Sequence, residues 1–243
     1  IYYMQYKLLF LDTETTGNEA KDRLCQVAYS DGKNRIEALF KPPVPISIES
    51  MAVHHITPKM VLDKPAFKFS EEHAFLAKKF KEEETIVVAH NAIFDLDMLA
   101  KEDLIPDKFI CTLRVARYLD PEEKIPSYRL QYLRYFLDIE IEATAHDALG
   151  DVLVLEKLFE RLFRKIADSE ELTESQTYEK MIEISKTPSL IRTFRFGKYN
   201  GQKVEEVAKI DRGYLEWMLA QKSTADSGEE DWIYTLNHFL GKN

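Results

Sequence analysis

Strand-like and helix-like segments alternate along the first 165 residues, and this alternation restricts the fold more than any other feature. Residues 7–12 (KLLFLD) hold four consecutive apolar side chains, as a strand buried on both faces does. Residues 85–89 (TIVVA) are apolar and β-branched, and residues 24–29 and 36–40 are shorter strand candidates. Strands and helices pack as layers, so the sequence predicts an α/β fold with a mixed central sheet flanked by helices.

The helices are predicted from their caps and from the spacing of apolar residues. Ser70 precedes a helix predicted over residues 71–81, and its hydroxyl is expected to cap the first turn. Asn91 is expected to cap the next helix through its side-chain oxygen. The longest helix is predicted over about residues 147–164. Two further helices are predicted over residues 112–119 and 127–136.

A small second unit follows these elements. Residues 166–189 are polar and acidic in their first half, which predicts a helical linker. Beyond it, residues 192–196 alternate apolar and basic side chains like a strand, and three short helices are predicted over 204–208, 212–221 and 231–240. We therefore divide the chain into a main unit at residues 4–165, a linker at 166–189 and a small α+β C-terminal unit at 190–243.

Composition excludes several classes of protein. The chain has 243 residues, of which 45% are hydrophobic and 31% are charged, so it is not disordered or collagen-like. No stretch approaches the roughly 20 uncharged apolar residues of a membrane span, and the N-terminus lacks a signal-peptide pattern. Cys25 and Cys111 match no metal or redox spacing. We therefore expect buried thiols, a cytoplasmic location and no membrane partner.

Charge is unevenly distributed. The net charge of −9 by itself disfavours a nucleic-acid ligand, although a site that gathers carboxylates for cations also makes a chain acidic. Residues 186–203 contain five basic residues and no acidic one, whereas residues 204–243 contain eight acids and four bases. A local basic cluster is what contacts with phosphates require.

Acidic side chains follow two of the predicted strands. Asp12 and Glu14 stand two residues apart at the end of the first strand, so both project from one face. Such pairs occur about seven times by chance in so acidic a chain, and the position at a strand end distinguishes this one. Asp95 lies one turn inside the helix after strand 85–89, near the same sheet edge. The alternative is a carboxylate that only interacts with the helix dipole.

His146 and Asp151 flank the start of the longest predicted helix. On a continuous helix they would be about 140° apart, so the helix must begin between them if both are to reach one site. The alternative is a histidine that lies on the surface or caps the helix. Converging carboxylates repel one another unless cations bind, and an all-oxygen ligand set suits Mg²⁺ or Mn²⁺.

Two bound cations beside an imidazole form a site that can hydrolyse a phosphodiester. Two ions about 3.5–4 Å apart stabilise both the attacking and the leaving oxygen of a phosphoryl substitution. An imidazole with a pKa of about 6.5 accepts a proton from water at neutral pH. The residues therefore predict metal-assisted hydrolysis of a phosphodiester.

Three motifs occur in order along the chain, FLDTETTG at 10–17, HNAIFD at 90–95 and HDALGD at 146–151. Together they resemble the DnaQ-like, or DEDDh, family of 3′→5′ exonucleases over about residues 7–164. The resemblance implies a ribonuclease-H-like fold. It also implies that His146 is the general base and that four carboxylates bind two Mg²⁺ or Mn²⁺ ions, namely Asp12, Glu14, Asp95 and Asp151.

The resemblance also implies a pocket for the terminal nucleotide. Its expected members are Thr15, Thr16, Val53, His54 and Phe94, with Phe94 packing on the base or sugar. The alternative for Phe94 is a place in the core. The family's His-Gly-Ile-Thr run reads His-His-Ile-Thr here, with His55 in place of the glycine.

The tail is similar to a small module found after some exonuclease-X-like members of the family. Phe194 and Phe196 are expected to be core residues rather than platforms for stacked bases. Arg195, Lys198 and Lys203 either contact phosphates or form a solvated basic edge, and the sequence favours neither alternative.

The resemblance implies a metal-dependent 3′→5′ exonuclease that releases nucleoside 5′-monophosphates. Its expected partner is a nucleic acid with a 3′ end, with DNA favoured, and a polymerase or repair partner is compatible with the family. One alternative is a 3′→5′ exoribonuclease, because the catalytic residues do not distinguish the two sugars. Another is a catalytically silent nucleic-acid-binding or polymerase-associated module.

Overall fold

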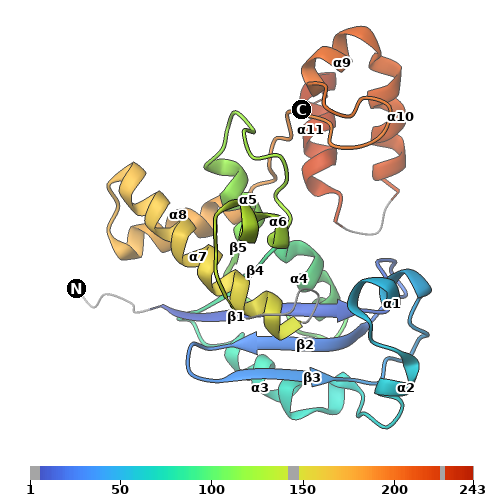
Figure 1. Ribbon diagram of the computed structural model, residues 1–243, viewed down its shortest axis with the longest axis vertical. Coiled ribbons are helices and arrows are strands. Elements are labelled where there is room, and N and C mark those ends of the chain that lie inside the picture. The colour runs from blue at the N-terminus through green and yellow to red at the C-terminus, as the bar shows by residue number, and fades with distance from the viewer. Residues whose placement is uncertain (1–5, 142–147, 225–227, 243) are drawn as a thin grey trace.

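A computed structural model describes residues 6–141, 148–224 and 228–242 (Figure 1). Within this part of the chain five strands form one mixed sheet, in the order β3-β2-β1-β4-β5. They are β1 (Lys7–Thr15), β2 (Leu24–Ser30), β3 (Arg35–Leu39), β4 (Thr85–Ala89) and β5 (Phe109–Cys111). β2 is antiparallel to both β1 and β3, whereas β4 pairs in parallel with β1 and β5. The predicted mixed sheet is confirmed, and β5 was missed because three residues are too few to show a pattern.

Helices cover both faces of the sheet. In the main unit they are α1 (Ile48–His54), α2 (Pro58–Val61), the 3-10 helix η1 (Phe67–Phe69), α3 (Glu71–Lys79), α4 (Ala92–Ala100), α5 (Thr112–Tyr118), α6 (Leu130–Phe136), α7 (Ala148–Glu170) and α8 (Glu174–Lys186). α7 lies across β1 and β2, and α5, α6 and α8 pack in the core on that face. α3 and α4 pack on the opposite face.

Both faces of β1 are buried, which explains its unbroken apolar sequence. Leu9 and Leu11 join the core beneath α3 and α4, whereas Phe10 joins the core beneath α7. Because successive strand residues point to opposite faces, Asp12 and Glu14 follow Phe10 toward α7. The strand thus delivers two carboxylates to the face that α7 covers.

The segment that the sequence suggested as a linker belongs to the main core. α7 continues past residue 164 to Glu170, and α8 begins at a capping box formed by Thr173 and Gln176. Met181, Ile182 and Ile184 of α8 are buried against the apolar residues of α7 and β5. Residues 166–189 are therefore mostly helical, as expected, but they are not a solvated spacer, because the second half of the segment carries an apolar face.

The C-terminal unit is built from α9 (Val204–Ile210), α10 (Arg212–Lys222) and α11 (Glu230–Leu240), close to the three predicted helices. Its own core centres on Phe194, which is fully buried as expected. The predicted strand over 192–196 is reduced to a single bridge between Thr193 and Lys203. The prediction that Phe196 belongs to the core is wrong, because 43% of this residue is exposed.

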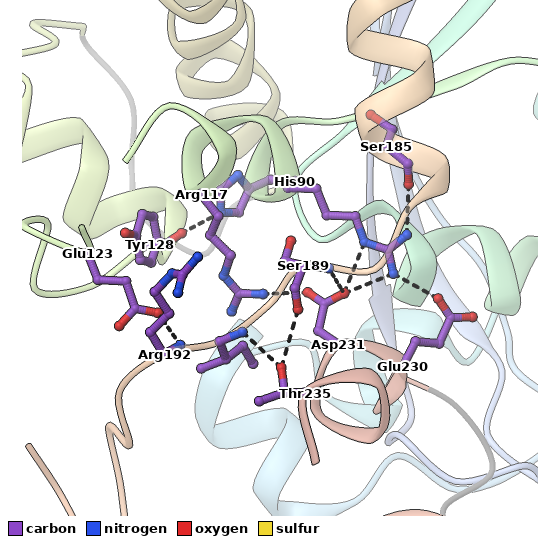
Figure 2. Close-up of polar contacts among 12 residues, drawn as sticks. His90, Arg117, Glu123, Tyr128, Ser185, Ser189, Arg192, Glu230, Asp231 and Thr235 are labelled. Carbon is purple, nitrogen blue, oxygen red and sulfur yellow. Dashed lines mark hydrogen bonds and ion pairs between the residues drawn. The ribbon is translucent and has the colours of Figure 1, made fainter. Parts of the chain in front are cut away.

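Arg114 of α5 fastens the C-terminal unit to the main unit. Its side chain is buried, with Nη1 donating to the carbonyl oxygen of Ser185 at 2.7 Å. Its other nitrogens bind two carboxylates of α11, with Nη2 at 2.8 Å from Glu230 and Nε at 3.1 Å from Asp231. Arg117 also pairs with Asp231 (Figure 2).

Backbone groups of residues 189–192, which follow α8 and lead into the C-terminal unit, complete this attachment. Asp231 accepts from the backbone N–H of Ser189 at 3.0 Å, and Thr235 Oγ1 accepts from that of Ile191 at 2.8 Å. The backbone N–H of Arg192 donates to Glu123 of the main unit at 2.6 Å (Figure 2). Charged and neutral hydrogen bonds therefore hold α11 and residues 189–192 against α5 and the loop that follows it.

Two expectations from composition can be compared with the structure. Cys25 and Cys111 are free and buried, as expected. Among the helices of the described residues, none is both long enough and apolar enough to cross a membrane.

Candidate active site

Three carboxylates meet where β1 ends beside the start of α7. Asp12 and Glu14 come from β1, and Asp151 comes from the first turn of α7. Each offers one ligand oxygen, and these atoms lie within 4.8 Å of one another. The pairing of β1 with β2 shifts register between Glu14 and Thr15, so the strand ends at this place. The structure thus brings together carboxylates that are about 140 residues apart in sequence.

Asp151 is held by a residue that the sequence analysis missed. The side-chain amide of Gln131 in α6 donates a hydrogen bond to Asp151 Oδ1. The first turn of α7 packs closely, with Ala148 and Gly150 buried, and a carboxylate is favoured there by the helix dipole. No pattern in the sequence marks a lone glutamine as the partner of an acid 20 residues away.

Asp95 of α4 acts on Asp12 through its charge, but it is not one of the three acids whose ligand atoms lie within 4.8 Å of one another. It is buried in α4, and its Oδ1 accepts from the backbone N–H of Thr13 at 3.0 Å and from the Thr13 hydroxyl at 2.7 Å. Thr13 lies between Asp12 and Glu14 in β1, so these two hydrogen bonds tie α4 to the carboxylate pair. Thr13 is a second positioning residue that the sequence analysis did not identify.

Asp12 interacts with the charges of the other three carboxylates. The pKa of Asp12 lies well above its usual value, first because of burial and then because of the charges of Asp95, Asp151 and Glu14. Burial also raises the pKa of Asp95 to about 7, although the hydrogen bonds from Thr13 lower it. Acidic oxygens crowded in this way match the ligand set of a hard divalent cation.

The turn that leads to Asp95 is formed differently from the prediction. Asn91 stands at the N-cap of α4, but its side chain makes no capping hydrogen bond, so that prediction is wrong. Its backbone is left-handed, with φ of 61°, a conformation that asparagine tolerates better than most residues. The left-handed residue turns the chain sharply from β4 into α4 and so directs Asp95 toward β1.

His90, just before this turn, is a structural residue. Its Nε2 donates to the carbonyl oxygen of Tyr128 at 2.7 Å, and its Nδ1 lies 2.9 Å from the hydroxyl of Thr112. Burial lowers the pKa of His90 to about 4, so the ring is neutral. It links β4 to the loop before α6, which carries Gln131.

His54 is also occupied by backbone groups. Its Nδ1 accepts from the N–H of Ile56 at 3.0 Å, and its Nε2 donates to the carbonyl oxygen of Thr15 at 3.1 Å. Burial lowers its pKa, which keeps the ring neutral. The Nε2 bond holds α1 to the end of β1, and the Nδ1 bond fixes the turn that follows α1. The neighbouring His55 has a left-handed backbone with φ of 62°, where a glycine would be unstrained.

Thr16 and Asp22 shape the loop that follows β1. The Thr16 hydroxyl donates to Asp22 Oδ1 at 2.7 Å, and both side chains are buried. A Cβ on Gly17 would lie 2.3 Å from Asp22 Oδ2, so any other residue there would force the Asp22 side chain to move. The glycine of the first motif thus has a packing reason. Asp22 was missed by the sequence analysis because it stands in no motif.

The remaining expected residues differ in exposure. Val53 of α1 is 52% exposed. Phe94 is partly buried and packs against the core beneath α3 and α4, which agrees with the alternative of a place in the core, and its packing on a base or sugar stays a prediction. Thr15 is buried, and its hydroxyl donates to the carbonyl oxygen of Gly17 at 2.7 Å. His146 lies outside the described residues.

Comparisons with known proteins agree with this geometry. Residues 9–159 match a family model described as Exonuclease, and residues 194–223 match one described as Exodeoxyribonuclease X-like C-terminal. Exodeoxyribonuclease 10 of Escherichia coli K12 is 34% identical over 238 residues, which cover 96% of this chain and 98% of that protein. DNA polymerase III subunit epsilon of Treponema pallidum is 32% identical over 160 residues, covering 61% of this chain and 72% of that protein.

A solved structure shares the fold. The structure of exonuclease X in complex with 5′-overhanging duplex DNA superposes with a TM-score of 0.56 at 29% identity, and the match covers 73% of this chain and 99% of that one. The predicted ribonuclease-H-like architecture is therefore confirmed. By sequence, fold and the cluster of acids at the end of β1, the chain belongs to the exonuclease family.

Proposed function

We propose that this exonuclease removes nucleotides from the 3′ end of DNA and releases nucleoside 5′-monophosphates. The observation that carries the proposal is the convergence of Asp12, Glu14 and Asp151, whose ligand atoms lie within 4.8 Å of one another. The names of the relatives, an exodeoxyribonuclease and an exonuclease bound to duplex DNA, support DNA as the substrate.

Four carboxylates hold two Mg²⁺ or Mn²⁺ ions in this proposal, namely Asp12, Glu14, Asp95 and Asp151. When bound, the ions stabilise negative charge on the attacking and leaving oxygens of the phosphodiester. Thr13 and Gln131 orient Asp95 and Asp151, so that the ligand oxygens are in place before substrate arrives. His146 accepts the proton of the attacking water on a ring nitrogen.

The terminal nucleotide is held by Thr15, Thr16, Val53, His54 and Phe94 in this proposal. His54 and Thr16 act through the shape of the backbone, because their polar atoms already bind protein groups. Val53 of α1 and Phe94 of α4 supply apolar contact in this proposal.

The setting of the enzyme is a further part of the proposal. Two free, buried cysteines support a reducing compartment such as the cytoplasm. The similarity to a polymerase epsilon subunit supports association with a polymerase.

We take the C-terminal unit to begin at residue 190, and we extend the main unit to residue 189 because α8 packs in its core.

The test follows the release of nucleotides from single-stranded DNA, duplex DNA and RNA that carry a 3′ label. With Mg²⁺ or Mn²⁺ the wild type should release labelled mononucleotides from DNA, and EDTA should stop the reaction. Asp12→Ala should abolish release, and His146→Ala should slow it by about 10²–10⁴-fold. Release in EDTA, or a preference for RNA over both DNA substrates, would contradict the proposal.

A further inference from the structure

The loop between α5 and α6 contacts both the C-terminal unit and the supports of the acidic site. It spans residues 119–129 and leads directly into Gln131, whose amide binds Asp151. Its end also holds the turn before α4, because the carbonyl oxygen of Tyr128 accepts from His90 Nε2 at 2.7 Å (Figure 2). The position of this loop therefore affects two supports of the acidic site.

The C-terminal unit binds this loop at Glu123. The carboxylate of Glu123 accepts from the backbone N–H of Arg192 at 2.6 Å, and its carbonyl oxygen accepts from Arg195 Nη2 at 3.2 Å. The same guanidinium nitrogen lies 3.5 Å from the carbonyl oxygen of Ile125. The sequence alternatives for Arg195 were a phosphate contact and a solvated edge, whereas in the structure its guanidinium binds the main unit.

Glu123 is held in an unfavourable state. Its backbone is left-handed, with φ of 53°, a conformation that few residues other than glycine, asparagine and aspartate adopt. Its Oε2 is buried and accepts no hydrogen bond from the part of the chain that the structure describes. Strain of this kind persists only where surrounding contacts enforce it, and it is concentrated at functional positions. The hydrogen bonds from Arg192 and Arg195 are contacts of this kind.

Hydrogen bonds within the loop make it a stiff connection. The carboxylate of Asp120 accepts from the backbone N–H groups of Lys124 at 3.0 Å and Ile125 at 2.7 Å. It also accepts from the hydroxyl of Tyr128 at 2.9 Å. A displacement of Ile125 is therefore passed to Tyr128, which stands three residues before Gln131.

We propose that the C-terminal unit supports the metal site of the nuclease, with Glu123 and Arg195 as positioning residues that act through the loop on Gln131. The inference rests on the proposed function, in which Asp151 is a metal ligand. A residue that orients a ligand changes the affinity for the metal without contacting the metal itself. Coupling of this kind passes through contiguous hydrogen bonds between stiff elements. The C-terminal unit should therefore influence metal affinity although it supplies no ligand.

The experiment measures the affinity of the full chain for Mn²⁺ by isothermal titration calorimetry, without nucleic acid. Glu123→Ala and Arg195→Met should each weaken Mn²⁺ binding about 3- to 30-fold, as expected of residues that act on a site from a distance. Glu122→Ala is the matched control, because Glu122 is the preceding residue of the loop and its largely exposed side chain pairs only with the exposed Lys124 among the ion pairs of the described residues. It should leave the affinity unchanged.

A double substitution shows whether the effect passes through Gln131. If it does, Glu123→Ala combined with Gln131→Leu should weaken Mn²⁺ binding no more than Gln131→Leu alone. Circular dichroism checks that each variant is folded, and Arg195→Met replaces Glu123→Ala in the double variant if the latter is not. Wild-type affinity in a folded Glu123→Ala or Arg195→Met, an equal loss in Glu122→Ala, or additive losses in the double variant would overturn the proposal.

Failure of the proposed function gives a different result. A wild type that binds Mn²⁺ but releases no mononucleotide from labelled DNA contradicts the proposed function, and the calorimetric comparison of the variants still decides the role of Glu123 and Arg195. A wild type that releases mononucleotides while all the variants bind Mn²⁺ equally contradicts only the role of the C-terminal unit. Absence of Mn²⁺ binding by the wild type would overturn both.

Discussion

Thr13 lies between the two carboxylates of β1 and connects them to a third. Its backbone N–H and its hydroxyl both donate to Asp95. In the same way, the side-chain amide of Gln131 in α6 donates to Asp151. Neutral donors that bind acidic ligands fix the direction of each oxygen without adding charge. At the scale of the residue, the site is therefore a set of acids held by uncharged partners.

We expect Gln131→Leu to weaken divalent-metal binding about 10- to 100-fold, because Asp151 loses the amide that orients it. The measurement is the Mn²⁺ concentration that gives half-maximal nucleotide release. Saturating Mn²⁺ should restore most of the rate. Tyr132→Leu, at the next position on α6 and on its exposed side, is the control and should leave the Mn²⁺ requirement unchanged.

The pH dependence of stability should report on Asp95. Its pKa is raised to about 7 by burial, whereas an unfolded chain has a value of about 3.9. Between these values the folded protein holds a proton that the unfolded chain has released, so stability falls as pH rises. In EDTA, the free energy of unfolding of the wild type should therefore decrease between about pH 4 and about pH 7, by at most about 1.4 kcal/mol per pH unit for this proton.

Asp95→Asn provides the comparison for this titration, because the amide cannot titrate but its oxygen can still accept from Thr13. Urea unfolding at several pH values should give a shallower slope for the variant than for the wild type. Parallel slopes would mean that Asp95 is ionised in the folded protein throughout this range.

At the scale of the element, the first turns of helices position the acidic side chains of the candidate site. α4 follows β4 through the left-handed Asn91, and α7 begins where Asp151 can meet β1. The attachment of α11 to α5 follows a similar pattern, with Asp231 in the first turn of α11 binding Arg114 and Arg117. Each contact places a charged side chain at a helix end that is fixed by tertiary packing.

We expect Asp231→Ala to destabilise the C-terminal unit by about 3 kcal/mol, because the buried Arg114 guanidinium would lose its main anion. Glu230→Ala should cost less than about 1 kcal/mol, since that carboxylate is half exposed and solvent replaces it. Urea denaturation of the full chain, followed by tryptophan emission, measures both values. Equal effects of the two substitutions would show that Arg114 does not depend on Asp231.

At the scale of the whole molecule, the acids oppose folding until cations bind. The pKa of Asp12 is raised by burial and by its acidic neighbours, so its charge is unfavourable in the folded protein alone. Ligands that bind only the folded state stabilise it by mass action. The nuclease site is therefore expected to couple metal binding to the stability of the entire main unit.

We expect Mn²⁺ or Mg²⁺ at 100 times its dissociation constant to stabilise the wild type by about 2.7 kcal/mol, seen as a higher Tm. Asp12→Asn should lose this response, and in EDTA it should melt at a higher temperature than the wild type because one repelling charge is gone. An unchanged metal response in Asp12→Asn would exclude Asp12 from the metal site.

Much of this arrangement could be predicted from the order of residues. The strands of the sheet, apart from β5, follow from apolar runs, and the positions of Asp12, Glu14, Asp95 and Asp151 follow from three motifs that stand at strand or helix ends. The helices α9, α10 and α11 follow from their apolar spacing. Local periodicity and motif spacing are properties of the chain itself, and so they are visible before folding.

Other features were decided only by the tertiary structure. Gln131, Thr13 and the Arg114–Asp231 pair act through contacts between distant segments, and the burial of α8 depends on the space left beside α7 and β5. The exposure of Phe196 and the left-handed turn at Asn91 have the same origin. The sequence by itself determined which side chains could perform the chemistry, whereas the packing of distant segments decided which groups hold them, because hydrogen bonds and burial depend on distances that sequence separation does not encode.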